Sequence, residues 1–531
     1  MLRRIYHILA DHGPTSAEQV RLWVQLLMAL WAARLIYRIL IYPGYVSPLR
    51  HLPGPKNNHY LLGQLVNQYR ASTPTQLFQQ WSSQWPDSPF IRFKGLAKSD
   101  MLLVNTVEAH RQVLQTCCYD FQKPGFFARL VGEIAGAGLL FAEADDHKRQ
   151  RRFVQNVFTL PNLRKLFPVF QCKAKELTTY LSSFLERSGE HEIEVQSIFT
   201  KATLDIIGVT TLGVELENLR TPDVKLDFLS CYNRMIEQSK LSALISFINV
   251  QVPIRRWVPL EANRGFVRAS NAVREILKEC IRERMQAMLK HHDSGRRETV
   301  SRDLLSYLIG ERISGKSELS DEQILGHLMN FLSAGHETTA GAMTWAIYVL
   351  ATNQEIQDHL YAEIRELRSN NPAQDYTTVD RLPYLHNFVR ELLRLYSPAV
   401  FTNREATRNV IICGFHIPKG TKLVLSPYVT NLSPRVWGPD SPEFHPKRWD
   451  NLSEEAAGPY GIETFSNGPR ICIGKHYAIM EIKALLVELL SHFVVTKGKA
   501  LESLENEAVP LHNPAVTLRP RDGLRVKLYP R

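Results

Sequence analysis

The stretch that decides the fold reads Phe465-Ser466-Asn467-Gly468-Pro469-Arg470-Ile471-Cys472-Ile473-Gly474, and a strong helical pattern follows over residues 475–493. Cys472 therefore precedes a helix N-terminus, where unpaired amides and the helix dipole favour the thiolate that binds metals. Gly468 and Gly474 allow tight turns and the close approach of a flat ligand. Arg470 is placed to pair with a carboxylate of that ligand.

The rest of the composition is that of an ordinary globular protein. The chain has 531 residues, 44% of them hydrophobic, which excludes disordered, collagenous and small disulfide-rich classes. Its seven cysteines include no C-x-x-C pair, so no zinc or disulfide framework is readable. Lys+Arg exceed Asp+Glu by 64 to 53, an excess that suits nucleic acid, an acidic membrane surface or an acidic protein partner.

A second informative stretch begins at Ser320-Asp321-Glu322-Gln323, which has the form of a capping box. It predicts a helix that runs to about Thr352, on the order of 30 residues, long enough to cross the core of a large domain. After residue 56 the sequence shows no internal repeat, so it predicts one body organised around this long helix. Further helical patterns lie at residues 161–185 and 271–289, and short β-rich runs lie at 410–417 and 423–429.

The centre of the long helix reads Ala334-Gly335-His336-Glu337-Thr338-Thr339. Gly and Thr are poor choices for a helix interior, so two interpretations stay open. One is a packing notch with threonines bonded back to the helix. The other is a groove for a small ligand, with Glu337 and Thr338 as a proton route. A zinc-protease motif H-E-x-x-H is excluded, because position 340 is Ala.

Two more motifs complete the pattern: Glu391-Leu392-Leu393-Arg394, whose charged ends share a helix face, and Phe444-His445-Pro446-Lys447-Arg448-Trp449. The pattern F-x-x-G-x-R-x-C-x-G at 465–474 resembles the heme-binding signature of the cytochrome P-450 superfamily. These two motifs and A-G-x-E-T-T at 334–339 precede it in the order that this superfamily has. The sequence is most similar to fungal membrane-bound members. The resemblance covers about residues 50–531 and implies a mainly α fold with small β-sheets, a triangular helical body with a long central helix.

The resemblance also implies roles for individual residues. Cys472 would be the axial thiolate of the heme iron. His147 stands where the family's W-x-x-x-R segment has tryptophan. The expected heme b contacts are Cys472, Phe465, Gly468, Arg470, Gly474, His147, Arg151 and Arg404; the structural triad is Glu391, Arg394 and Arg448; the proton-handling pair is Thr338 and Glu337.

The implied activity is that of an NADPH-dependent monooxygenase, since an axial thiolate favours O–O cleavage. The chain has no G-x-G-x-x-G fingerprint between a strand and a helix, so electrons should come from a separate NADPH-cytochrome reductase. A basic surface for an acidic partner is expected at Lys148, Arg149, Arg152 and Lys475. A heme-thiolate isomerase or dehydratase and a heme sensor stay open as alternatives.

The substrate is expected to be a hydrophobic small molecule, because the family's layout draws pocket walls from apolar stretches. These walls are residues 121–140, 229–250, 400–402 and 512–516, and Ala334. Fungal relatives suggest secondary-metabolite biosynthesis; fatty acid, sterol and xenobiotic oxidation stay open, as does the choice between hydroxylation and epoxidation.

The N-terminal part predicts a membrane anchor. Residues 22–42 are apolar except for Gln25, Arg34 and Arg38, and have the length of a single span, although a helix lying in the interface is the alternative. The expected division is an anchor with flanks at 1–48, a proline-rich hinge at 49–56 and the monooxygenase domain at 57–531. Residues 1–56 carry seven Lys+Arg against two Asp+Glu, nearly half the basic excess. We therefore expect the endoplasmic reticulum membrane, a cytosolic catalytic domain and no nucleic acid.

Overall fold

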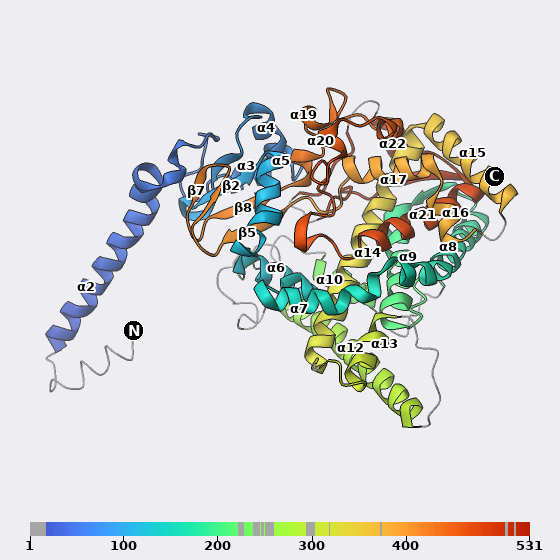
Figure 1. Cartoon of the computed structure of the whole chain (residues 1–531), viewed down its shortest axis with the longest axis horizontal. Coiled ribbons are helices and arrows are strands. Elements are labelled where there is room, and N and C mark those ends of the chain that lie inside the picture. The colour runs from blue at the N-terminus through green and yellow to red at the C-terminus, as the bar shows by residue number, and fades with distance from the viewer. Residues whose placement is uncertain are drawn as a thin grey trace.

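The computed structural model describes residues 17–220, 228–236, 245, 249, 257, 260–293, 303–317, 319–371, 374–504, 508–513 and 517–531. This part of the chain is mainly helical with small sheets, as the sequence predicts. Figure 1 shows a broad body that tapers toward α12 (Glu261–Asp293), with α14 (Asp321–Thr352) through its middle. The helix α2 (Ala17–Ile36) projects away from this body.

The other helices of the described residues are α3 (Leu65–Arg70), α4 (Gln76–Gln84), α5 (Val107–Arg111), α6 (Gly125–Ala135), α7 (Ala144–Val154), α8 (Leu160–Ser188), α9 (Val195–Ile207), α10 (Phe228–Ile236), α13 (Leu304–Ile313), α15 (Gln354–Asn370), α16 (Tyr376–Asp380), α17 (Pro383–Leu395), α18 (Pro427–Thr430), α19 (Pro434–Trp437), α20 (Glu454–Ala457), α21 (Lys475–His492) and α22 (Lys499–Ser503). The helices predicted at 161–185, 271–289 and 475–493 are confirmed as α8, α12 and α21.

The central helix α14 starts as its sequence predicts. The Ser320 hydroxyl accepts a hydrogen bond from the backbone N–H of Gln323 at 3.3 Å, and the Gln323 side chain accepts one from the Ser320 N–H at 2.9 Å. This reciprocal capping box satisfies two amides that a helix start otherwise leaves unpaired. The helix then continues for 32 residues to Thr352.

The middle of α14 is a packing notch against α9. A Cβ added at Gly335 would lie 2.7 Å from Cδ1 of Ile207, so glycine allows the two helices to approach closely. Thr338 bonds back to the helix, its hydroxyl donating to the Ala334 carbonyl at 2.7 Å. Both features of the packing interpretation are therefore present. Ala334 is nevertheless exposed, which leaves room for a ligand beside the same turn.

The described chain contains three small sheets in addition to its helices. The largest has the strand order β1-β2-β8-β5-β3, and the others are β4-β10-β9 and the hairpin β6-β7. The strands are β1 (Phe90–Lys94), β2 (Asp100–Val104), β3 (Phe121–Gln122), β4 (Glu192–Glu194), β5 (Thr402–Ala406), β6 (Val410–Ile412), β7 (Phe415–Ile417), β8 (Lys422–Leu425), β9 (Phe493–Lys497) and β10 (Arg525–Pro530).

One strand is shorter than predicted. The β-rich run at 423–429 is a strand only as far as Leu425, and α18 begins at Pro427. Proline has no N–H for the β-ladder, and its fixed φ suits the first turn of a helix. The prediction is therefore wrong for the second half of this run.

The N-terminal helix is long and apolar enough to cross a membrane. The candidate span is Gln19–Val46, 28 residues with a mean hydropathy of 1.6, and none of its most apolar window is buried in the body. Beyond α2 it continues as a π-helix, Tyr37–Val46, that contains Pro43. Its end is fastened to the body, because Arg92 on β1 donates to the Pro43 carbonyl and forms a bidentate ion pair with Asp100 on β2.

A buried ion pair on α17 forms hydrogen bonds with the loops that lead toward the cysteine. Glu391 and Arg394 have fully buried side chains, and the guanidinium donates to both carboxylate oxygens, at 2.9 and 2.7 Å. The same carboxylate accepts from the His445 N–H at 3.0 Å, Arg448 at 3.3 Å and the Trp449 indole at 2.9 Å. Glu391, Arg394 and Arg448 thus form one hydrogen-bonded cluster.

Arg394 carries the cluster into the following loops. Its guanidinium donates to the carbonyls of Asn431 at 2.8 Å, Ser441 at 2.7 Å and Glu443 at 3.1 Å. Removing one partner of a buried ion pair is strongly destabilising, because the charge that remains is buried and has no water to replace the lost contacts.

Arg394→Met should therefore lower the free energy of unfolding by about 3–5 kcal/mol, the usual effect of removing one partner from a buried ion pair. Urea unfolding of the purified protein measures this loss. The matched control is Arg187→Met near the end of α8, where the side chain is exposed and a change within about 0.5 kcal/mol is expected. Equal urea midpoints for the two variants would contradict the prediction.

Candidate functional site

The loop before α21 presents Cys472 at the start of the helix. The Cys472 N–H donates to the Phe465 carbonyl at 2.8 Å, and the Ile471 N–H donates to the Gly468 carbonyl at 3.0 Å. These two bonds close residues 465–472 into a tight turn. Gly474 is the N-cap of α21, so the sulfur stands two residues before that cap.

Glycine is required at position 468 for two independent reasons. Its φ is +69°, in the left-handed region, and an added Cβ would lie 2.1 Å from the Leu114 carbonyl oxygen. At Gly474 an added Cβ would lie 3.9 Å from the Cys472 sulfur, an ordinary contact. The tight turn expected of these glycines is thus needed at Gly468, where the loop packs on the backbone of residues 112–116.

The Cys472 side chain is accessible, although the protein packed around it raises the pKa of its thiol by burial. The Gly474 N–H and the positive charges of Arg151 and Lys475 act in the opposite direction, and burial outweighs them. The helix start alone therefore does not hold this cysteine as a thiolate; a bound metal ion would do so.

Arg470 lies between the cysteine loop and the segment that precedes α7. Its guanidinium donates to the Ala142 carbonyl at 3.0 Å and forms an ion pair with Glu143. Its Nε is buried and, among the described residues, finds no hydrogen-bond partner. Buried polar atoms are normally paired, so this atom points to a ligand.

Arg404 comes from β5 and is fully enclosed by protein. Its guanidinium donates to the Thr402 hydroxyl at 3.1 Å and to the Asn403 carbonyl at 2.9 Å. Burial, followed by the nearby charge of Arg470, lowers the pKa of Arg404 to about 10. The two arginines are therefore close enough to repel each other.

His147 and Arg151 share one face of α7, since they are four residues apart. Arg151 donates to the Ile471 carbonyl at 2.6 Å and so contacts the residue next to Cys472. His147 is buried, with Nδ1 3.3 Å from the Tyr119 hydroxyl. Burial, then Arg470 and Arg151, lower the pKa of His147 to about 3, so the ring is neutral at physiological pH. A neutral imidazole carries one N–H donor, as does the tryptophan that the resemblance would place here.

These side chains fit the heme that the resemblance implies. Arg470 and Arg404 lie near one carboxylate of the described residues, that of Glu143. Arg151 lies near Arg470, and Arg470 keeps an unpartnered buried N–H. Mutual repulsion between buried arginines is relieved by an anion with more than one carboxylate. Heme has two carboxylates and an iron that takes a thiolate, so both ends of the site match the group.

The predicted proton-handling pair, Glu337 and Thr338, follows the notch glycine Gly335 on α14. Thr338 and Glu337 are partly accessible, next to the exposed Ala334. The Glu337 carboxylate accepts from the Thr517 hydroxyl at 2.8 Å, and the Thr338 hydroxyl donates to the Ala334 carbonyl. Glu337 is therefore held by the C-terminal segment and not by Thr338. His336, which precedes Glu337, is buried, and its Nδ1 lies 2.6 Å from the Leu332 carbonyl oxygen, which is a structural role.

Sequence reasoning missed three residues of this neighbourhood. Glu143 pairs with Arg470, Thr517 holds Glu337, and Lys123 lies near Arg404 and Arg470. Lys123 had a signal, as a charged residue in the mostly apolar stretch 121–140 of the expected pocket wall, and Glu143 adjoins that stretch. Thr517 had none, because its partner is 180 residues away in the sequence.

The expected pocket walls are only partly described. Phe121 and Val400 are buried in the core, while Leu140 keeps 38% of its surface exposed and Ala334 is exposed. Residues 237–244, 246–248, 250 and 514–516 lie outside the described residues.

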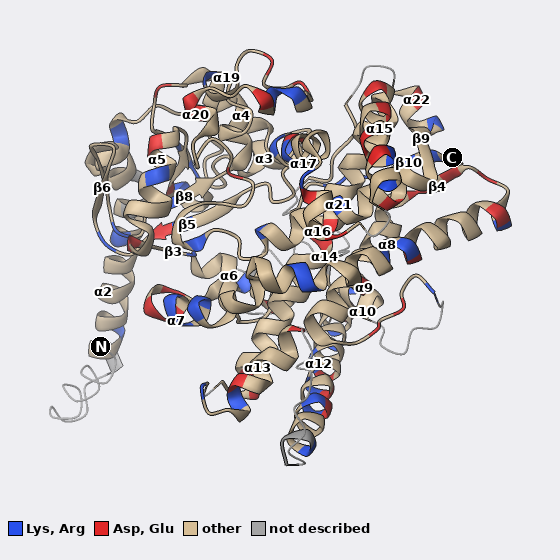
Figure 2. Ribbon diagram, turned by 45° about the vertical axis from the view of Figure 1, so that its right-hand side comes forward, with Lys and Arg blue, Asp and Glu red and all other residues tan. Residues whose placement is uncertain are grey.

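The basic surface predicted for a partner is partly neutralised. On α7, Lys148 pairs with Asp145 and Arg149 with Asp146, each at 2.8 Å. Figure 2 shows acidic (red) and basic (blue) positions close together along the α7 ribbon. Arg152 is exposed and Lys475 half-buried.

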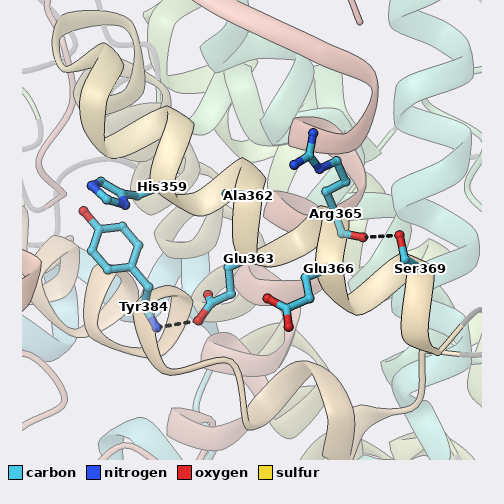
Figure 3. Close-up of a pocket in the computed structure, with 7 residues that line it drawn as sticks. All are labelled: His359, Ala362, Glu363, Arg365, Glu366, Ser369 and Tyr384. Atoms are coloured by element: carbon cyan, nitrogen blue, oxygen red, sulfur yellow. Dashed lines mark hydrogen bonds between the residues drawn. The ribbon is translucent and has the colours of Figure 1, made fainter.

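A surface hollow elsewhere carries none of the predicted site residues. It lies over α15 and the start of α17, lined by His359, Glu363, Glu366 and Tyr384 among others (Figure 3). Glu363 accepts from the Tyr384 N–H at 2.8 Å and caps the first turn of α17. This carboxylate is thus engaged in holding the helix.

The chain is similar to known proteins over most of its length. The model of the family described as Cytochrome P450 matches residues 53–519. The chain is 29% identical to Cytochrome P450 monooxygenase sphH of Aspergillus fumigatus, over 97% of this chain and 94% of that protein. It is 30% identical to Cytochrome P450 monooxygenase FUM15 of Gibberella moniliformis (93% and 90%) and 31% identical to Cytochrome P450 monooxygenase 128 of Postia placenta (94% and 95%). The chain therefore belongs to the cytochrome P450 family of heme-thiolate oxidoreductases.

Proposed function

We propose that the protein is an NADPH-dependent monooxygenase that inserts one oxygen atom of O2 into a hydrophobic small molecule. The observation that carries the proposal is the accessible Cys472 side chain before α21, near Arg151 and a cluster of buried arginines with too little negative charge. Heme b satisfies both features. When bound, a thiolate-ligated heme supplies O–O cleavage.

The residues of this chain would hold the heme by three kinds of contact. Cys472 would ligate the iron. Arg470, Arg404 and Arg151, with the neutral His147, would bind the carboxylates. Phe465, Gly468 and Gly474 would shape the loop that supports the ligand. Glu391, Arg394 and Arg448 would act behind this loop as a structural cluster, since their contacts are with protein groups.

Thr338 and Glu337 would handle protons on the opposite side of the site. The Thr338 hydroxyl donates a hydrogen bond to the Ala334 carbonyl, so the lone pairs of the Thr338 oxygen are left to accept a hydrogen bond from another group. Glu337 holds a carboxyl group one residue earlier, fixed by Thr517. A carboxyl group next to an oriented hydroxyl is the arrangement of a proton relay.

Electrons would come from NADPH through the separate NADPH-cytochrome reductase. The exposed Arg152 and the half-buried Lys475 would contribute to its docking surface more than the paired Lys148 and Arg149. The helix at 19–46 would anchor the chain as a single pass in the endoplasmic reticulum, with the body in the cytosol. The fungal sources of the relatives support a role in secondary-metabolite biosynthesis.

The first test is the absorption spectrum of the reduced protein with carbon monoxide. We expect the red-shifted band of a thiolate-ligated heme in the wild type and its loss in Cys472→Ala, because alanine supplies no sulfur ligand. Cys172→Ala, at an exposed cysteine on α8, should keep the band in full. Survival of the band in Cys472→Ala would overturn the proposed ligand.

The second test concerns proton handling. With reductase, NADPH and a turnover substrate, Thr338→Ala should divert electrons to hydrogen peroxide and lower product per NADPH by about 10- to 100-fold, within the range of general acid–base effects. Thr352→Ala loses the same type of bond, to the Tyr348 carbonyl at 2.8 Å at the end of α14, and should keep its coupling. Equal coupling in both variants would exclude the role of Thr338.

The third test concerns the anchor. Deletion of residues 1–46 should release the protein from alkaline-washed membranes, since it removes the one candidate span of the described chain. In sealed microsomes, an N-terminal tag on the full chain should resist external protease. Digestion of that tag would show that the helix lies in the interface.

A further inference from the structure

Asn330 on α14 holds the backbone of residues 135–140, the segment that connects α6 with α7. Its side-chain amide donates hydrogen bonds to the carbonyl of Ala135 and, at 3.2 Å, to that of Gly136. Its Oδ1 accepts a hydrogen bond from the Leu140 N–H at 2.7 Å. The side chain is only 5% exposed, so both N–H groups and the oxygen of the amide are engaged with this connecting segment.

Glycines allow the connecting segment to lie directly on α14. A Cβ added at Gly138 would lie 2.5 Å from the Gly326 carbonyl oxygen and 2.7 Å from Oδ1 of Asn330. At Gly136, where φ is +73°, an added Cβ would lie 2.8 Å from Cβ of Met329. No side chain therefore fits between the segment and the helix at these points, and the backbone itself forms the contact.

The polar part of this attachment depends on one side chain. Of the hydrogen bonds in the described chain, those that join α14 to residues 135–140 all involve Asn330. The carbonyls of the buried Ala135 and Gly136 would lose these donors if Asn330 were replaced by an apolar residue. Unpaired buried carbonyls are unfavourable, so the segment would then leave its place on the helix.

The attachment lies on the face of α14 that carries the predicted proton-handling residue. Asn330, Ala334 and Thr338 follow one another at intervals of four residues, so they share one face of the helix. At 1.5 Å per residue, Asn330 lies about 6 Å along the axis before Ala334. Ala334 is exposed, and Leu140 keeps 38% of its surface exposed. The connecting segment is thus fixed one helical turn from the place where Ala334 leaves room for a ligand.

We propose that Asn330 is a positioning residue, which holds the connecting segment so that Leu140 forms a fixed apolar wall of the substrate pocket beside Ala334. The inference rests on the proposed function, because it takes the space beside Ala334 as the substrate pocket. Both N–H groups of Asn330 are bound to backbone carbonyls, so they are not offered to the substrate. The part of the substrate that meets this turn is therefore apolar, and a wall held in one place selects substrates by their size.

The test compares two azoles that bind heme iron through a nitrogen and shift its absorption spectrum. Imidazole occupies little more than the open position of the iron, whereas clotrimazole adds three aromatic rings that must lie against the pocket walls. In the full-length holoprotein, Asn330→Leu should raise the dissociation constant of clotrimazole about 10-fold, because a wall that is no longer held must be ordered on binding. The dissociation constant of imidazole should stay within about twofold of the wild type.

Two further variants approach the same wall without changing Asn330. Leu140→Ala removes the side chain of the wall and should also raise the clotrimazole constant about 10-fold, since it removes apolar contact area. The fold tolerates this change, because Leu140 is partly exposed. Gly138→Ala should have the same effect by moving the connecting segment away from α14.

Asn353→Leu is the matched control. This exposed asparagine follows the end of α14, and its amide donates to the Val349 carbonyl of its own helix at 3.0 Å. The variant should bind both azoles like the wild type.

The ratio of the clotrimazole constant to the imidazole constant decides the outcome. The ratio must rise in both Asn330→Leu and Leu140→Ala, and an unchanged ratio in either variant overturns the inference. Equal weakening of both azoles also overturns it, because the change would then disturb the heme and not the wall. If Asn330→Leu does not retain heme, Gly138→Ala takes its place under the same criterion.

The wild type separates this inference from the proposed function. A wild type that shows the carbon monoxide band of a thiolate-ligated heme, and binds clotrimazole no more tightly than imidazole, overturns the wall alone. Absence of that band from the wild type would overturn the proposed function instead.

Discussion

The carboxylate of Glu391 is the constraint on which the cysteine loop depends. It is fully buried and holds Arg394, and Arg394 holds the carbonyl of Asn431. The Asn431 side chain then accepts from the Glu463 N–H at 2.8 Å and donates to the Thr464 hydroxyl at 2.9 Å. Thr464 precedes the residue whose carbonyl accepts from Cys472. An unbroken line of hydrogen bonds therefore connects the core of α17 with the position of the sulfur.

The opposite end of the site follows a different principle. Buried arginines repel one another, and Arg404 and Arg470 are held close by contacts with the Thr402 hydroxyl, backbone carbonyls and the one carboxylate of Glu143. The cluster is therefore poorly balanced by protein groups alone. Such an arrangement lowers the stability of the empty protein and raises its affinity for an anion. Binding of the anion therefore also stabilises the fold.

Local patterns in the sequence predicted what is locally determined. The capping box at Ser320, the start of α21 and the spacing of Glu391 and Arg394 all concern neighbours in the chain, and the structure has each of them. The partners of Glu337 and Arg470 could not be predicted from such patterns, because Thr517 and Glu143 reach them only through the tertiary fold. Gly468 was expected because the loop turns there. Its second requirement, the space taken by the Leu114 carbonyl oxygen, could not be predicted because Leu114 is distant in the sequence.

The attachment of the N-terminal helix has a consequence for the orientation of the whole molecule. The candidate span of 28 residues is about 40 Å long at 1.5 Å per residue, longer than the hydrocarbon core of about 30 Å. In a bilayer such a helix tilts to bury its full length. Arg92 on β1 donates a hydrogen bond to the Pro43 carbonyl near the end of this helix. Because this contact joins the helix to the sheet, a tilt of the helix would rotate the body with it. Membrane thickness would then set the angle at which the catalytic domain meets the lipid surface.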